Sequence, residues 1–286
     1  MSPRARPLLS LERTLGDLAW RLPSSRARLE AAADDRHVWV LYDQSGRDAV
    51  SLWDVDTGCE VGGTSFATRR VSNTAVSRDG RTLALVHDDG VTVWDAYAGA
   101  TIRTFEGPRE PWLVLDERGA RLLVWGGRND PDERGPFLYD VGTGEGRRVN
   151  GVSVLAHGSA TLSLDATTLV ASGFPSQVQS WDITNEAPRA LHEVQMRGWV
   201  SQCAPVSDGG VFVGTSEGEV SRWSPRDGVT RWVRDDLREH VWRLCATPDG
   251  RRVALTCIQG GGRRHDVRAR RPHGGDPAEL FLRLAR

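Results

Sequence analysis

A short pattern that recurs six times along the 286-residue chain constrains its fold more than any other sequence feature. Each copy is a run of mostly apolar residues with an aromatic residue near its end, followed in most copies by an aspartate and a turn. The aromatic positions are Trp53, Trp94, Tyr139, Trp181, Trp223 and, in degraded form, His265. They are separated by 41, 45, 42, 42 and 42 residues. Intervals that agree this closely indicate tandem copies of one structural unit.

A second apolar segment precedes each copy, and its composition is typical of a strand that is buried on both faces. These segments are residues 36–41, 81–86, 120–125, 167–172, 210–215 and 251–256. Four of them follow a tight-turn signal that ends in glycine, at residues 78–80, 117–119, 207–209 and 248–250. Such turns need a positive φ and connect the two strands of a hairpin. Further short strands are expected before these turns, as at 71–77 and 200–206, and after the aromatic segment, as at 100–107.

Four short strands in about 42 residues, without helical periodicity between them, are typical of one blade of a β-propeller. A single such sheet cannot bury both of its faces, whereas sheets stacked in a ring bury each face against a neighbour. The sequence therefore predicts an all-β fold, a single closed β-propeller with six four-stranded blades, and seven blades as the alternative. The expected division is an N-terminal segment at 1–26 and the propeller at 27–286.

The aromatic segment resembles the signature of the WD-repeat propellers. Trp-Asp dipeptides stand at Trp53-Asp54, Trp94-Asp95 and Trp181-Asp182, and Tyr139-Asp140 is a conservative variant. The resemblance covers residues 27–284 and implies a binding platform, since that family shares a shape rather than a chemistry. The Gly-His dipeptide of the family is missing from every repeat, so its His–Ser/Thr–Trp–Asp hydrogen-bond set is expected to be incomplete.

Two segments compete to complete the last blade. The end of the chain, residues 277–286, has the pattern of an outer strand, and so do residues 8–15. In the WD-repeat family the N-terminal strand commonly completes the last blade. The sequence leaves both arrangements open, and also leaves open whether residues 1–25 form part of a seventh blade.

The composition excludes several function classes. The formal net charge is −1, which gives no overall field to attract nucleic acid or an anionic membrane. All 37 basic residues are arginine, so any mechanism that needs a lysine is excluded. The four cysteines have no metal-ligand spacing and are expected to be small buried residues of strands. No signal peptide or membrane span is found, so a cytoplasmic location is expected.

The sequence contains none of the common catalytic or nucleotide-binding motifs, and its seven histidines fall at unrelated positions of the repeat. Paired acids at 34–35, 88–89 and 235–236 lie in predicted turns. The regular positions of Asp54, Asp95, Asp140 and Asp182 indicate an architectural role. We therefore expect no enzyme activity, no cofactor and no metal site.

Three tryptophans outside the repeat signature, Trp112, Trp199 and Trp242, are expected at one equivalent position of the repeat, at the start of the innermost strand. In the WD-repeat family this position lies near the face most used for partners, where an aromatic side chain is a strong interface anchor. Packing between blades is the alternative. The insertion at 126–136 should open on the same face, where Arg128, Asp132 and Glu133 would add a charged rim.

These features favour a non-catalytic protein–protein interaction platform, with the partner docking on the face of these tryptophans. The alternative function is that of a propeller enzyme or small-ligand sensor that uses the central channel. The arginine-rich segment at 263–271 is interpreted as a decayed terminal repeat, with an anion-binding or nucleic-acid-binding patch as the alternative. The sequence does not identify the partner.

Overall fold

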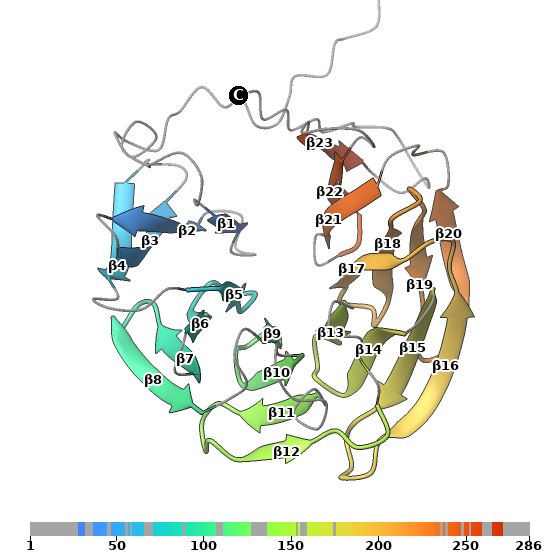
Figure 1. The fold of residues 1–286 in the computed structure, drawn as a ribbon, viewed down its shortest axis with the longest axis horizontal. Helices are drawn as coiled ribbons and strands as arrows, with labels where there is room; N and C mark the ends of the chain where they lie inside the picture. Colours follow the sequence, from blue (N-terminus) through green and yellow to red (C-terminus); the bar gives the residue numbers. More distant parts are fainter. Residues whose placement is uncertain are drawn as a thin grey trace, which may run out of the picture. The chain divides into compact units, whose positions relative to one another are not determined.

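The structure, a computed structural model, describes most of the repeat region and omits both ends of the chain. The described residues are 28–31, 37–44, 47–54, 57, 59–65, 71–87, 90–106, 111–126, 136–152, 154, 159–173, 176–234, 237, 240–246, 249–251, 253–258 and 265–270. All elements in these ranges are β-strands, numbered β1 to β23 (Figure 1). A search of the same ranges finds no helix with the length and hydropathy needed to cross a membrane.

The chain divides into two compact units, and one of them comprises Leu11–Asn150. Three four-stranded sheets form this unit. The first sheet contains β1 (Arg28–Ala31), β2 (His37–Gln44), β3 (Arg47–Asp54) and β4 (Cys59–Ser65). The second contains β5 (Asn73–Val76), β6 (Thr82–His87), β7 (Gly90–Asp95) and β8 (Ala100–Phe105). The third contains β9 (Trp112–Leu115), β10 (Arg121–Trp125), β11 (Phe137–Asp140) and β12 (Gly146–Arg148).

The other unit comprises Gly151–Arg286 together with Met1–Ser10. Its first sheet contains β13 (Ala160–Leu162), β14 (Thr168–Gly173), β15 (Gln177–Asp182) and β16 (Arg189–Gln195). The next contains β17 (Val200–Pro205), β18 (Val211–Thr215), β19 (Val220–Trp223) and β20 (Thr230–Arg234). The last contains β21 (His240–Ala246), β22 (Val253–Ile258) and β23 (His265–Arg270). The candidate outer strands for this sheet, residues 8–15 and 277–286, lie outside the described residues.

Every sheet is an antiparallel meander in which each strand pairs with the strands next to it in the chain. The aromatic residues of the repeat occupy the third strand and lie opposite an apolar residue of the second strand, as in Leu83↔Trp94 and Val211↔Trp223. The predicted hairpin turns are confirmed, because Gly80, Gly119, Gly209 and Gly250 have φ values of 70°, 67°, 81° and 65°. The second strands expected from the six apolar segments are also confirmed, with ends that shift by at most a few residues.

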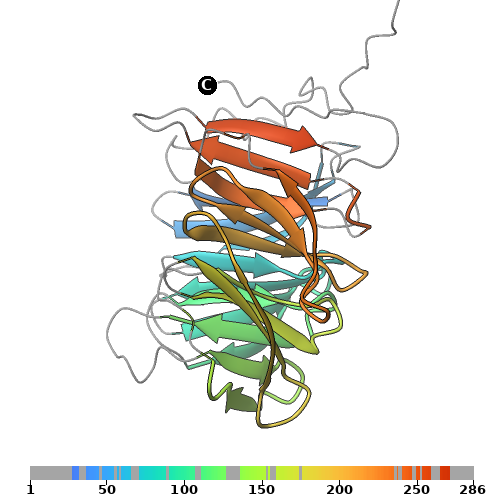
Figure 2. The same ribbon diagram turned by 90° about the vertical axis from the view of Figure 1, so that its right-hand side faces the viewer.

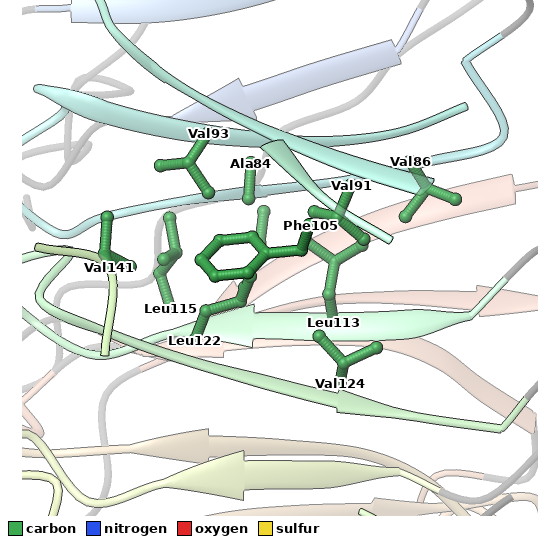
Figure 3. Packing of buried hydrophobic residues seen from close by; sticks show 11 residues of the cluster. Ala84, Val86, Val91, Val93, Phe105, Leu113, Leu115, Leu122, Val124 and Val141 are labelled. Atoms are coloured by element: carbon green, nitrogen blue, oxygen red, sulfur yellow. The ribbon is translucent and has the colours of Figure 1, made fainter. Parts of the chain in front are cut away.

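Within each unit the sheets stack face to face and bury their apolar side chains against one another. Figure 3 shows the cluster between the second and third sheets, where Phe105 lies among Val91 and Val93 on one side and Leu115 and Leu122 on the other. A similar cluster lies between the first and second sheets, with Trp39 and Trp94 in edge-on contact, their ring centroids 5.8 Å apart. Each sheet thus gains from its neighbour the burial that it lacks alone.

The second unit follows the same plan. Trp223 packs among residues of the β13–β16 and β17–β20 sheets, and Phe212 and Val241 belong to the cluster that joins β17–β20 to β21–β23. Figure 2 shows the red strands of the last sheet beside the orange strands of the sheet before it. The first strands of successive sheets are in contact, β13 with β17 and β17 with β21.

Hydrogen bonds also tie neighbouring sheets together. Trp39 Nε1 donates to the carbonyl of Gly80 over 3.1 Å, and Cys203 N donates to Ser159 Oγ over 2.9 Å. Ser180 Oγ donates to Pro225 O over 2.9 Å, and Ser201 Oγ donates to Val241 O. These polar contacts accompany apolar burial in holding the sheets together.

The expectation that the cysteines are buried is correct for Cys203 and wrong for Cys59 and Cys245. Burial raises the pKa of the Cys203 thiol to about 12, so this thiol is chemically inert. Cys59 begins the outer strand β4, where side chains face water. Cys245 follows the buried Leu244 in β21 and therefore points to the opposite side of the strand.

Candidate interaction surface

The most exposed large apolar side chain in the described part of the chain is Trp199, at 70%. Trp199 ends the segment that connects β16 to β17, while its neighbours Met196 and Val200 are buried at 5% and 7%. A tryptophan exposed to this extent is uncommon on a protein surface, and exposed aromatic side chains often mark contact sites. The structure thus brings one of the three candidate tryptophans to the surface.

The backbone around Trp199 is fixed by the turn between β18 and β19. Trp199 N donates to Ser216 Oγ over 2.9 Å, and Ser216 N donates to Trp199 O over 2.8 Å. The segment 196–199 and the turn 216–219 therefore form one hydrogen-bonded unit at the same end of the β17–β20 sheet. We refer to these residues, 196–199 and 216–219, as the anchor loops.

A buried carboxylate holds the other side of the anchor loops. Glu219 is only 8% exposed, and its Oε2 accepts a hydrogen bond of 2.8 Å from Arg197 N. Its Oε1 accepts one of 2.7 Å from Ser221 Oγ, and its own N–H donates to Thr215 Oγ1 over 3.1 Å. Charged acceptors that receive hydrogen bonds from fixed donors give strong and well-oriented contacts. Sequence reasoning missed Glu219, although it is the one charged residue at its position among the first five repeats.

Gly198 completes the anchor loops because no other residue fits there. Its φ is +74°, and a Cβ at this position would lie 2.7 Å from Glu217 Cγ and 2.8 Å from Ser216 Oγ. A side chain would therefore force the segment away from the turn. The close approach keeps the backbone of Trp199 against Ser216.

The other two candidate tryptophans differ from Trp199. Trp112 is the first residue of β9, lies opposite Trp125 and is half-buried. Trp242 is the third residue of β21, at a register shift between Val241 and Arg243, and its side chain lies outside the described residues. The prediction that the three positions are equivalent is therefore wrong, because Trp112 is paired within β9, Trp199 precedes the first residue of β17, and Trp242 lies at the register shift inside β21. Arg128, Asp132 and Glu133 also lie outside the described residues.

The regularly spaced aspartates cap the turns that follow the third strands, as the sequence predicts. Asp54 Oδ1 accepts from Thr57 N over 2.9 Å, and Asp95 Oδ1 accepts from Ala98 N over 2.9 Å. Asp140 and Asp182 accept from Thr143 N and Thr184 N over 2.8 and 3.0 Å. These carboxylates stabilise turns, which is an architectural role.

In three of these aspartates, Asp95, Asp140 and Asp182, hydrogen bonds to the carboxylate lower the pKa. Burial raises the pKa of Asp95, but hydrogen bonds from Ala98 N and Arg81 outweigh burial and lower the pKa overall. The Thr143 N–H lowers the pKa of Asp140, and the Thr184 hydroxyl lowers that of Asp182. Their environment therefore stabilises the charged form.

The repeat aromatics are buried between sheets, with Trp53, Trp94, Trp181 and Trp223 at 6%, 3%, 6% and 0% exposure. Tyr139 is half-buried and lies 4.7 Å from Phe105, measured between ring centroids. The prediction that His265 takes the aromatic position of the sixth repeat is wrong, because His265 begins β23 opposite Ile258. Arg270 lies opposite Val253, where the register of the other sheets places the aromatic residue. The described ranges contain no group of three or more His, Cys, Asp or Glu side chains that could hold a metal ion. The acid pairs at 34–35, 88–89 and 235–236 fall outside those ranges.

Known proteins provide a comparison for the fold. Neither family models nor curated proteins match the sequence. Among solved structures, the chain is similar to the crystal structure of the β-propeller domain of Cps50 (Swd1) from Myceliophteria thermophila, with a TM-score of 0.68. The fold is a β-propeller. The two chains share 12% sequence identity over 88% of this chain and 85% of the other, so the likeness extends over nearly all of this propeller but is one of fold alone.

Proposed function

We propose that this propeller is a non-catalytic protein–protein interaction platform of the WD-repeat type, with a partner that docks around Trp199. The observation that carries the proposal is the combination of a 70% exposed indole with a backbone fixed by Ser216 and Glu219. Aromatic residues that are ordered before binding lose little conformational entropy in a complex, and they dominate the energetics of many interfaces. Trp199 would thus protrude into an apolar recess of the partner.

The proposal includes features that go further than the described geometry. We propose that the six sheets close into a single six-bladed ring, and that Trp112, Trp242 and the 126–136 insertion with Arg128, Asp132 and Glu133 border the docking face. We also propose a cytoplasmic location, with protein rather than nucleic acid or membrane as the partner. Support comes from the repeated sheet topology, the similar propeller fold and the balanced charge.

A crosslinking experiment tests the docking face. A photoreactive phenylalanine analogue is placed at position 199 and, in a second protein, at position 229. Val229 is the matched control because it is 48% exposed and follows β19, at the opposite end of the same sheet. We expect position 199, and not position 229, to crosslink one specific protein in a native lysate.

The crosslinked protein is then purified and its affinity is measured directly. The variant Trp199→Ala should weaken binding by about thirtyfold or more, as is typical of a central interface aromatic. Val229→Ala should bind like the unmodified protein. Equal affinities of the folded Trp199→Ala and Val229→Ala variants would contradict the proposal.

A further inference from the structure

Glu219 stands where a charged residue is costly, and its contacts suggest why it is there. Glu219 is 8% exposed and directly precedes Val220, the first residue of the largely buried strand β19. A buried charge is tolerated when fixed donors satisfy it. Both oxygens have such donors, the N–H of Arg197 and the hydroxyl of Ser221.

In this arrangement, one buried hydrogen-bond donor next to Ser221 has no partner among the described residues. Glu219, Ser221 and Trp223 lie on one face of β19, because side chains alternate along a strand. Ser221 donates its hydroxyl proton to Glu219, while the buried Trp223 Nε1 has no hydrogen-bond partner in the described structure. An unpaired buried N–H destabilises a protein, so its presence needs an explanation outside stability.

We relate Glu219 to the order of the surface segment around Trp199. The Glu219 carboxylate fixes Arg197, and two residues further on Ser216 fixes Trp199. The two contacts hold both ends of a three-residue segment whose centre, Gly198, already has a positive φ of 74°. The segment is therefore ordered before a partner arrives, which lowers the entropic cost of binding.

We propose that Glu219 is a positioning residue that preorganises the anchor loops and presents Trp199. It acts through the backbone of Arg197, without itself contacting the partner. The consequence for binding rests on the proposed function, whereas the ordering of the segment does not depend on any partner.

Amide hydrogen exchange of the full chain tests the ordering directly. In Glu219→Ala, the Arg197 amide loses its acceptor and should exchange about ten- to a hundredfold faster, as expected for loss of a hydrogen bond to a charged group. Glu219→Gln keeps a carbonyl oxygen for Arg197 and an amide group for Ser221, so exchange should remain close to that of the unmodified protein. The turn at 224–229 is the internal control and should not change.

Thermal unfolding separates positioning from general stability. Without the carboxylate that orients it, Ser221 Oγ can rotate towards Trp223 Nε1 and accept its hydrogen bond. The unfolding temperature of Glu219→Ala should therefore change little while exchange at Arg197 accelerates. Unchanged exchange at Arg197 in a folded Glu219→Ala protein would overturn the proposal. Faster exchange of equal size at 224–229 would also overturn it, since Glu219 would then support the whole sheet.

Affinity for the protein crosslinked through position 199 provides the second readout. Glu219→Ala should weaken binding about three- to tenfold, the cost of ordering one side chain and its short segment on binding. Glu219→Gln should bind with nearly the affinity of the unmodified protein. Faster exchange at Arg197 without a change in the affinity of Glu219→Ala would overturn the link to binding. An unchanged affinity of Trp199→Ala would instead overturn the proposed function, and the ordering role would still be decided by exchange.

Discussion

The first and fifth sheets contain nearly the same third-strand sequence but use it differently. Val50-Ser51-Leu52-Trp53 in β3 corresponds to Val220-Ser221-Arg222-Trp223 in β19. In the first sheet, Trp53 Nε1 donates to Ser51 Oγ over 2.6 Å. In the fifth, Ser221 donates to Glu219 instead, and Trp223 Nε1 has no partner among the described residues.

One preceding residue accounts for this difference. Ala49 stands before Val50, and Glu219 stands before Val220. Beside the methyl group of Ala49, the Oγ of Ser51 is oriented towards the indole and accepts from it. The Glu219 carboxylate instead orients the hydroxyl of Ser221 towards itself. The comparison teaches that a repeat can keep its signature residues while redirecting their hydrogen bonds towards the surface.

The largest expected effect comes from moving the carboxylate into the first sheet. Ala49 is 2% exposed, and Ala49→Glu would place a carboxylate in a buried site that holds only a methyl group. We expect the free energy of unfolding to fall by about 3 kcal/mol or more. Ala49→Gln, of the same size and uncharged, should cost clearly less in denaturant unfolding. Equal losses would mean that size alone distinguishes the two positions.

A smaller effect is expected at the tryptophans themselves. Trp53→Phe and Trp223→Phe remove the same atoms from buried sites, but only Trp53 donates a hydrogen bond to its neighbouring serine. Trp53→Phe should therefore lower the free energy of unfolding by about 1 kcal/mol more than Trp223→Phe. Urea unfolding of both variants, with unchanged far-ultraviolet spectra, measures the difference. A larger loss of unfolding free energy in Trp223→Phe than in Trp53→Phe would contradict this account of the two sheets.

The smallest effect concerns the other end of the fifth sheet, where Arg226 contacts Asp165 of the preceding sheet over 2.8 Å. Burial raises the pKa of Asp165, but hydrogen bonds from Ser163 and Thr167 and the charge of Arg226 outweigh it and lower the pKa to about 2. A lowered carboxyl pKa stabilises the fold above about pH 4, and this stabilisation is lost as the pH falls towards 2.

Asp165→Asn should therefore lose stability at neutral pH and show a flatter dependence between pH 4 and pH 2. Both side chains are more than half exposed, so solvent screening limits the loss to about 0.5–1 kcal/mol. Unfolding free energies of the two proteins across this pH range test the expectation. Parallel pH profiles would show that Asp165 does not contribute to the pH dependence of the unfolding free energy.

The sequence predicts the sheets well because local signals determine them. Glycines at the hairpin turns and continuous apolar segments specify each meander within about 42 residues, and the observed strands follow these signals. The architectural role of Asp54, Asp95, Asp140 and Asp182 follows from their fixed place before a turn. These features depend on neighbours in the chain, which a sequence contains directly.

The surface is less predictable because it depends on contacts between segments. Trp112 and Trp199 look alike in the sequence, yet Trp112 is the first residue of β9 and lies opposite Trp125, whereas Trp199 precedes β17 and is exposed. The role of Glu219 depends on the Arg197 backbone, which lies 22 residues away in the chain. A signal for Glu219 exists, a carboxylate where the four preceding repeats have Ala, Gly or Gln, but its meaning requires the structure.

The anchor loops and the residues that fix them all lie between Met196 and Ser221. A single continuous stretch of the gene therefore encodes the exposed indole together with its support. Exchange of this stretch between repeats or between related propellers would transfer the presented side chain as a unit. Recognition could in this way diversify by recombination, while the remaining sheets continue to provide the scaffold.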